Sequence, residues 1–216
     1  MHEHGHEHGH DHGDHHHGRE LSRTELLTAA LESLLVEKGL LSSDAVDRIV
    51  ERYEKDVGPM IGARVVARAW VDPGYKQRLM STPASALAEL GIRMDNLVVV
   101  ENSPTAHNAI VCTLCSCYPW QVLGLSPAWY KDLAYRSRMV IEPRAVLQEF
   151  GLDVDESIEV RVWDSSAEQR YMVLPERPAG TEGLTEDELA ALVSRDAMIG
   201  VARVSAPALA RRGSVE

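Results

Sequence analysis

The sequence predicts an α+β protein, and three observations support this fold class. Apolar residues recur with a helical period in the first third of the chain, short apolar or alternating runs from residue 97 onward predict strands, and these runs do not alternate regularly with helices. The composition, 44% hydrophobic and 25% charged over 216 residues, is that of a globular protein able to bury one sizeable core. No apolar run approaches the roughly 18 residues that a membrane-spanning helix needs.

The N-terminus is a histidine-rich segment. Nine of the ten histidines lie in residues 2–17, among acidic residues and glycines. Because this segment offers no apolar face to a core, we expect residues 1–18 to form a disordered tail. Imidazole and carboxylate at this density capture Ni, Co, Zn or Cu weakly, which permits metal buffering, but a tail without a task of its own fits the pattern equally well.

Two amphipathic helices are expected after the tail. The first begins at the capping box Ser22–Glu25, covers residues 22–38 and ends before Gly39. Its apolar positions are Leu27, Leu31, Leu34 and Leu35. The second begins at Ser42 or Ser43, ends at Gly58-Pro59, and carries Val46, Ile49, Val50 and Tyr53 on one face. Residues 19–58 therefore predict a helical arm that either packs on its own globule or reaches across a partner subunit.

The remaining chain, residues 59–216, is expected to form the main domain. A helix over Ile61–Trp70 ends near Asp72-Pro73, and short helical pieces continue to Leu90. The predicted strands are 97–100, 109–111, 158–163 and 171–174. Further helices are expected at 143–150, before Gly151, and after the capping box Thr185–Glu188.

The net charge bears on the partners of this protein, and the start of the chain bears on its compartment. With 22 basic and 33 acidic residues the formal net charge is −11, which disfavours nucleic acid and anionic membranes. The start of the chain lacks the basic and apolar regions of a secretory signal, so we expect a cytoplasmic protein. In that reducing compartment the three cysteines are expected to be ligands or nucleophiles rather than disulfides.

All three cysteines lie within six residues, in the spacing C-x2-C-x-C of Cys112, Cys115 and Cys117. They directly follow an apolar strand, which would anchor one end of their loop. Thiolates are soft ligands that select transition metals and exclude Mg and Ca. A disulfide between such close neighbours would be strained and would leave one thiol over.

The other ligands decide what this loop does. A structural zinc site needs a fourth cysteine or histidine, and His107 is the only histidine outside the tail. Alternatively, the amide nitrogens of Ser116 and Cys117 lie between the sulfurs, and with a trivalent metal they would complete five ligands and leave a sixth position open. From spacing alone, structural zinc, a reactive metal and metal-free reactive thiols all remain open.

The segment Val111–Trp120, VCTLCSCYPW, resembles the metal loop of the nitrile hydratase α subunit in its cobalt form. Iron forms typically carry Ser in place of Thr113 and lack the pair Tyr118-Pro119. The resemblance covers most of the chain outside the tail, in blocks at 63–73, 127–131, 135–138, 161–168 and 174–183.

The resemblance implies a catalytic metal site. Low-spin Co(III), rather than the less favoured Fe(III), would be bound by the sulfurs of Cys112, Cys115 and Cys117 and by the amide nitrogens of Ser116 and Cys117. Cys115 would be oxidised to a sulfinate and Cys117 to a sulfenate, whose oxygen is a candidate nucleophile or base. Cys115, Ser116 and Cys117 would thus be the catalytic residues in the hydration of a small nitrile to its amide.

The resemblance also assigns surrounding residues and partners. Trp120 would line the substrate pocket, and the polar residues around the metal ligands would be Asp164, Glu168 and Arg170. The fold would be a layered α-β-β-α domain preceded by a helical arm, residues 19–58, which embraces the β subunit. Such chains work as αβ units that usually pair into α2β2, with an activator protein inserting the metal.

Two alternatives to nitrile hydratase are kept. A histidine-rich N-terminus also resembles the thiocyanate hydrolase γ subunit, in which an Arg tends to follow the Tyr-Pro pair where this chain has Trp120. A non-catalytic zinc- or cobalt-binding module, whose tail collects metal and whose cysteines store it, is the other alternative.

Overall fold

The structure is a computed structural model that describes residues 23–51 and 59–206. It divides into two units, residues 1–47 and residues 48–216. The expected tail 1–18, the capping box at Ser22 and the end of the second predicted helix lie outside the described residues. None of the helices within the described ranges is long and apolar enough to cross a membrane.

The first unit contains helix α1 (Arg23–Glu37), which confirms the helix expected at 22–38. Helix α2 (Ser43–Glu51) begins where the second helix was expected. On α1 the side chains of Leu27, Leu31 and Leu34 are 61%, 58% and 51% exposed. Three of the four leucines of the predicted stripe are therefore more than half exposed.

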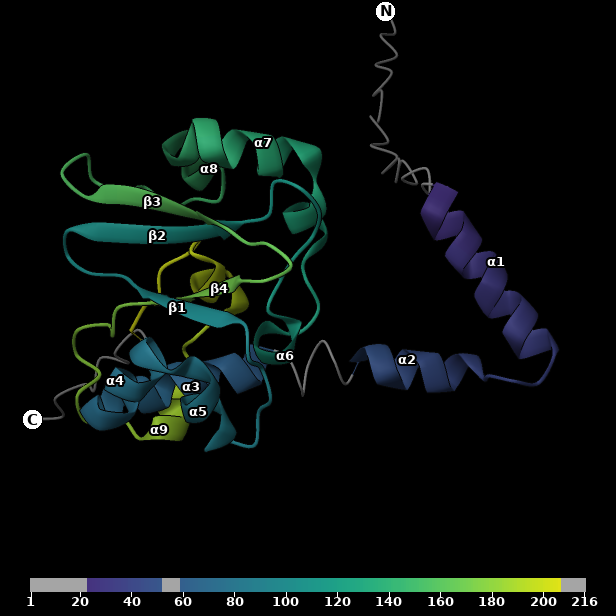
Figure 1. The fold of residues 1–216 in the computed structure, drawn as a ribbon, viewed down its shortest axis with the longest axis horizontal. Helices are drawn as coiled ribbons and strands as arrows, with labels where there is room; N and C mark the ends of the chain where they lie inside the picture. Colours follow the sequence, from purple (N-terminus) through teal and green to yellow (C-terminus); the bar gives the residue numbers. More distant parts are fainter. Residues whose placement is uncertain (1–22, 52–58, 207–216) are drawn as a thin grey trace, which may run out of the picture. The chain divides into compact units, whose positions relative to one another are not determined.

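The second unit is a mixed α and β domain (Figure 1). Its first helices are α3 (Pro59–Val71), α4 (Pro73–Ser81) and α5 (Pro83–Ala88). The strands are β1 (Leu97–Glu101), β2 (Ala106–Val111), β3 (Glu159–Asp164) and β4 (Arg170–Leu174). The remaining helices are α6 (Trp120–Leu123), η2 (Ala128–Lys131), α7 (Leu133–Ile141), α8 (Pro143–Glu149), α9 (Glu186–Ala190) and α10 (Arg195–Ile199).

Local capping explains several of these boundaries. The Asp72 carboxylate caps α4 by accepting a hydrogen bond from the Tyr75 amide, with Pro73 in the first turn, where its missing N–H costs nothing. The capping box predicted at Thr185 is present, since Thr185 and Glu188 satisfy each other's backbone amides at the start of α9.

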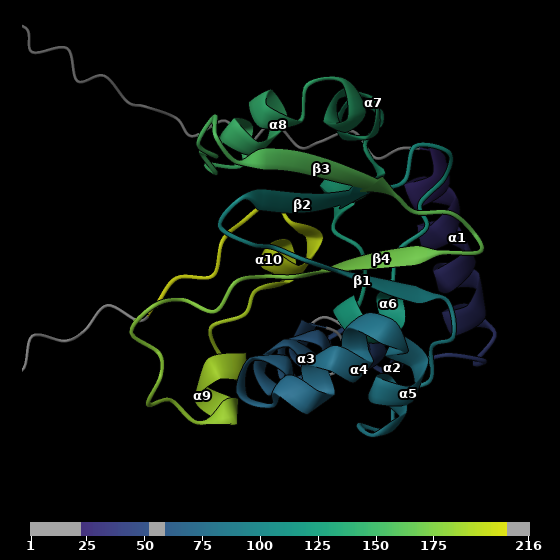
Figure 2. The ribbon, with the colours of Figure 1, turned by 60° about the vertical axis from the view of Figure 1, so that its left-hand side comes forward.

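The strands form two parallel pairs, β1 with β4 and β2 with β3. Helices α7 and α8 cover the β2–β3 pair, and α3, α4, α5 and α9 lie beyond the β1–β4 pair on the opposite side (Figures 1 and 2). This arrangement confirms the layered α-β-β-α domain. Because β2 lies in the middle of these layers, all six of its residues are buried, and the apolar core surrounds the start of the cysteine loop.

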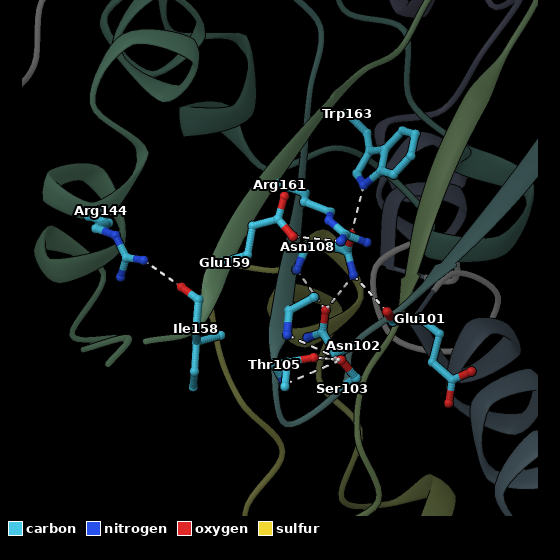
Figure 3. Close-up of polar contacts among 11 residues, drawn as sticks. Glu101, Asn102, Ser103, Thr105, Asn108, Arg144, Ile158, Glu159, Arg161 and Trp163 are labelled. Carbon is cyan, nitrogen blue, oxygen red and sulfur yellow. Dashed lines mark hydrogen bonds and ion pairs between the residues drawn. The ribbon is translucent and has the colours of Figure 1, made fainter. Parts of the chain in front are cut away.

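Polar side chains join the two strand pairs inside the core (Figure 3). Asn108 on β2 is 2% exposed, and its side-chain amide donates to the carbonyl of Glu101, the last residue of β1, at 2.7 Å. The Trp163 indole on β3 donates to Asn108 Oδ1 at 2.8 Å, and Asn102 Oδ1 accepts from the Asn108 backbone amide. The strand expected to begin at Ala109 therefore begins at Ala106. The three additional residues, Ala106, His107 and Asn108, are all buried, and two of them are polar.

Helices α6, α7 and α10 were not expected from the sequence. Helix α7 has the sequence LAYRSRMVI, which mixes charged and apolar residues without a clear stripe, and its start is fixed by the Asp132 carboxylate, which accepts from the Ala134 amide. This helix matters for the site because Arg136 projects from it toward the cysteine loop.

Candidate metal centre

The cysteine loop begins at the carboxyl end of β2 and runs to the start of α6. In the parallel pairing, Val111 lies opposite Asp164, and the Ser165 amide donates to the Val111 carbonyl at 2.7 Å. Because parallel strands end at the same edge of a sheet, this register places the β3–β4 loop beside the cysteines.

The three sulfur atoms converge. The Sγ atoms of Cys112, Cys115 and Cys117 all lie within 4.8 Å of one another. The distance is 3.4 Å from Cys112 to Cys115 and 3.1 Å from Cys115 to Cys117, and the Cys115 amide donates to Cys112 Sγ. None of the three is in a disulfide. This donor set fits one soft transition-metal ion, because all three sulfurs can reach the same point.

The pKa values of the Cys115 and Cys117 thiols differ. Hydrogen bonds from the Cys117 thiol and then from Cys112 lower the pKa of the Cys115 thiol to about 7. Burial, together with the hydrogen bond to Cys115, raises the pKa of the Cys117 thiol to about 12. Cys115, which is exposed, therefore ionises before Cys117.

The two ends of the loop are anchored to different elements. Thr113 donates to the Asp164 carboxylate through its backbone amide at 2.9 Å and through its hydroxyl. The Arg136 guanidinium donates to the carbonyl oxygens of Cys112 and Thr113, and the buried Tyr130 hydroxyl donates to the carbonyl of Cys117. The sequence reasoning missed Arg136 and Tyr130, although both fall in blocks that carry the family resemblance.

A pocket of about 400 Å³ opens beside the loop. Its lining includes Cys115, Ser116, Cys117, Tyr118, Trp120, Lys131 and Arg170. Trp120 stands at the start of α6 and is 51% exposed. The pocket can accept a small molecule in contact with both sulfur and a positively charged guanidinium.

The three polar residues predicted around the metal ligands, Asp164, Glu168 and Arg170, differ in how close they lie to the cysteine loop and the pocket. Asp164 holds the loop, and Arg170 lines the pocket while donating to the carbonyl oxygens of Ser166 and Ala167. Glu168 is exposed and accepts from the Ser166 hydroxyl, which lowers the pKa of the Glu168 carboxyl, and it does not line the pocket. The structure thus brings Asp164 and Arg170 to the site and leaves Glu168 at its periphery.

His107 is not among the converging groups. It lies inside β2, 3% exposed, rather than upstream of the strand as expected. One ring nitrogen bonds the Gly200 carbonyl at 2.8 Å and the other lies 3.3 Å from the Asn102 amide nitrogen. Within residues 23–51 and 59–206, therefore, the sulfur group includes neither a histidine nor a carboxylate as the fourth ligand that tetrahedral zinc requires.

Comparison with known families agrees with this geometry. The family model described as "Nitrile hydratase, alpha chain" matches residues 22–202. The chain belongs to the nitrile hydratase alpha-chain family. The match covers the cysteine loop and the elements β3, α7 and η2 that carry its anchors.

Individual relatives include both metal types and a related hydrolase. The chain is 56% identical to the low-molecular weight cobalt-containing nitrile hydratase subunit alpha of Rhodococcus rhodochrous over 184 residues, 84% of this chain and 89% of that one. It is 43% identical to the thiocyanate hydrolase subunit gamma of Thiobacillus thioparus, over 85% and 81%. A double mutant of the Fe-type nitrile hydratase from Comamonas testosteroni Ni1 superposes with a TM-score of 0.75 at 43% identity, covering 88% of this chain and 97% of that one.

Proposed function

We propose that this chain is the α subunit of a cobalt-type nitrile hydratase, which adds water across the C≡N bond of a nitrile to give the amide. The observation that carries the proposal is the convergence of three cysteine sulfurs within 4.8 Å beside a pocket of about 400 Å³. Membership of the nitrile hydratase alpha-chain family supplies the reaction.

Co(III) is the proposed metal, held by the sulfurs of Cys112, Cys115 and Cys117 and by the amide nitrogens of Ser116 and Cys117. When bound, it supplies a Lewis acid for a nitrile or a water molecule. The 56% identity to a cobalt-containing subunit supports cobalt, as do Thr113 and the pair Tyr118-Pro119. Iron is the alternative to cobalt as the single bound metal, and the 43% identity to an Fe-type enzyme supports it.

The chain's own residues bind and orient the reactants. In the proposed sulfinate form of Cys115 and sulfenate form of Cys117, these side chains would carry oxygen atoms that accept hydrogen bonds, and the Cys117 oxygen would act as nucleophile or base. Ser116, which lies between these two cysteines in the chain, contributes its backbone amide nitrogen as a proposed metal ligand. Trp120 forms an apolar wall for the nitrile, while Arg170 brings positive charge to the same pocket.

Asp164 and Glu168 act farther from the substrate. Asp164 keeps the loop in position through Thr113. Glu168 orders the β3–β4 loop through Ser166, whose hydroxyl also accepts from the Gln169 amide. Both carboxylates therefore order the loops beside the pocket and do not line the pocket themselves.

The domains and partners complete the proposal. Residues 59–216 form the catalytic domain, and residues 19–58 form an arm that contacts the β subunit, which the exposed leucines of α1 support. The αβ unit pairs into α2β2 in the cytoplasm, and an activator protein inserts the cobalt. The tail, residues 1–18, is proposed to take no direct part in catalysis.

The test is co-expression of the full chain with its β subunit in medium supplied with cobalt. We expect cobalt in the purified complex, amide formation from a nitrile, and oxygen additions on the peptide that contains Cys112–Cys117 by mass spectrometry. An unmodified peptide in a complex that holds zinc and makes no amide would instead identify a metal-binding module and overturn the proposal.

Thiocyanate hydrolysis is the second candidate, because of the 43% identity to a thiocyanate hydrolase subunit gamma. The same purified complex should be assayed with thiocyanate beside the nitrile. Trp120 stands where that subunit family tends to carry Arg, so we expect the nitrile to be the better substrate. A complex that consumes thiocyanate and leaves nitriles untouched would reverse the assignment.

A further inference from the structure

We propose that Arg136 is a positioning residue that holds the first limb of the cysteine loop, Cys112-Thr113, in the shape that captures the metal. The inference rests on the proposed function, since it takes the cysteine loop to be a metal site. Arg136 lies on α7 and is half-buried. Its Nε donates to the Cys112 carbonyl at 2.9 Å, and its Nη2 donates to the Thr113 carbonyl at 2.7 Å.

A guanidinium suits this task for a geometric reason. Its donors lie in one plane in a fixed fork, so two donors that engage two successive carbonyl oxygens fix the relative orientation of the two peptide groups. Cys112 is the first sulfur ligand, and its carbonyl begins the turn that returns the Cys115 amide to within 3.3 Å of Cys112 Sγ. Arg136 therefore acts on the backbone at the point where the chain bends to bring the sulfurs together.

Thr113 is held from two sides. Its carbonyl accepts from Arg136 on α7, while its amide and its hydroxyl donate to Asp164 at the end of β3. The polar groups of Thr113 therefore form hydrogen bonds with one positively charged donor, Arg136, and with one negatively charged acceptor, Asp164. These charge-assisted bonds are stronger than neutral ones, so the first limb has little freedom to rotate.

The other end of the cysteine loop, at Cys117, is also held by a hydrogen bond. The Tyr130 side chain is fully buried, and its hydroxyl donates to the Cys117 carbonyl at 3.1 Å. Both ends of the cysteine segment are therefore bonded to the body of the domain. A ligand set held this way loses less conformational freedom on binding an ion, so the ion is bound more tightly.

Arg138 provides a matched contrast on the same helix. It is also a half-buried arginine, but it forms ion pairs with Glu142 and Glu149 and has no bond to the cysteine loop. Removing Arg138 removes a positive charge and contacts of α7 and α8 without touching the backbone of Cys112 or Thr113. It therefore separates the stability of α7 from the positioning of the loop.

The experiment uses the complex of the full chain with its β subunit, produced in cobalt medium. The variants are Arg136→Ala, Arg136→Lys and the control Arg138→Ala. Cobalt per complex, the rate at which a chelator removes it, and the sulfur-to-cobalt absorption band are measured, and gel filtration with circular dichroism reports assembly and folding. Since partners that orient metal ligands change metal affinity or activity by about 10- to 100-fold, we expect the chelator to remove cobalt from the Arg136→Ala complex about 10- to 100-fold faster than from the wild-type complex.

The remaining outcomes distinguish the alternatives. Arg136→Lys should assemble and retain an intermediate amount of cobalt, because an ammonium group cannot reproduce the planar fork, and it replaces the alanine variant as the test if that variant does not fold. Arg138→Ala should retain wild-type cobalt and the wild-type absorption band. Full cobalt in both Arg136 variants, or equal loss in Arg138→Ala, would overturn the role of Arg136, whereas a wild-type complex without cobalt would overturn the proposed metal site itself.

Discussion

Cys115 is the most exposed of the three sulfur-bearing residues, and it is the one that links the other two. Its sulfur lies 3.4 Å from that of Cys112 and 3.1 Å from that of Cys117. A thiol in this position is the central donor of the set, and it ionises before the Cys117 thiol. Its loss leaves two sulfurs that cannot enclose an ion from three directions.

Substitution of Cys115 by alanine should therefore abolish cobalt retention and amide formation in the αβ complex. The side chain is exposed, so folding should be preserved, and gel filtration and circular dichroism provide that control. Metal analysis and a nitrile assay measure the effect. Normal turnover by a cobalt-free Cys115→Ala complex would remove the proposed mechanism.

His107 makes a residue-specific contribution to stability that depends on pH. Burial lowers its pKa in the folded chain, opposed by the hydrogen bond to the Gly200 carbonyl and reinforced by the nearby Arg203. The folded state therefore prefers neutral imidazole, while the unfolded chain takes up a proton near pH 6.5. The stabilisation is complete above that pH and decreases as the pH falls below it.

We expect the stability difference between the wild-type chain and His107→Gln to change in favour of the variant as the pH is lowered from 7.5 to 5.5. Comparing the two proteins cancels the contribution of the carboxylates, which titrate in both. Urea unfolding midpoints at several pH values measure the difference. Parallel pH profiles for the two proteins would contradict a buried, neutral His107.

Helix α10 shows how closely the elements approach one another. It ends at Gly200, which has φ +92°, and an added Cβ there would lie 2.1 Å from the Asn108 carbonyl oxygen and 2.7 Å from Ala109 Cα on β2. Both neighbours are backbone atoms of a buried strand, so they cannot move aside as a side chain would. Glycine is required here by its conformation and by the space available.

Gly200→Ala should therefore destabilise the chain by about 3 kcal/mol or more, combining the left-handed backbone penalty with overpacking. Gly180→Ala is the matched control, because Gly180 has φ +80° with no atom within 4 Å of the added Cβ. Its expected cost is only about 1–2 kcal/mol. Equal losses in chemical denaturation would show that the close contact with β2 carries no energy.

The molecule as a whole presents apolar surface where a partner is proposed. Leu27 and Leu31 on α1 are more than half exposed, and the pocket beside the cysteines is open to solvent at Trp120. Buried apolar area stabilises association by roughly 25 cal/mol per Å², so each leucine contributes about 1–3 kcal/mol when covered. These surfaces fit a chain that is completed by a second subunit.

The double substitution of Leu27 and Leu31 by glutamine should weaken binding of the β subunit by about 10-fold or more. The exposed Glu37→Gln on the same helix serves as the control and should leave association unchanged. Sedimentation of the two-subunit mixture over a range of concentrations measures the effect. Wild-type association by the double variant would show that the arm does not contact the β subunit.

The histidine-rich segment is expected to lie outside catalysis. Deletion of residues 2–17 should leave the turnover of the cobalt-loaded complex nearly unchanged, because the proposed sulfur ligands are Cys112, Cys115 and Cys117. Metal content must be matched between the two proteins before kcat is compared. A large fall in kcat at equal cobalt content would give the tail a direct part in the reaction.

The proposed metal ligands and most of the helices and strands follow from local patterns in the chain. The cysteine spacing places three soft donors on one hexapeptide. Periodicity with a capping box predicts α1, a second capping box predicts the start of α9, and α8 is predicted between Pro143 and Gly151. The anchors of the loop could not be predicted in this way. Asp164 reaches Thr113 only through the register of β3 on β2, and Arg136 reaches the same limb only because α7 packs against that sheet. Local spacing identifies the chemical donors, whereas pairing and packing of distant segments decide how those donors are held.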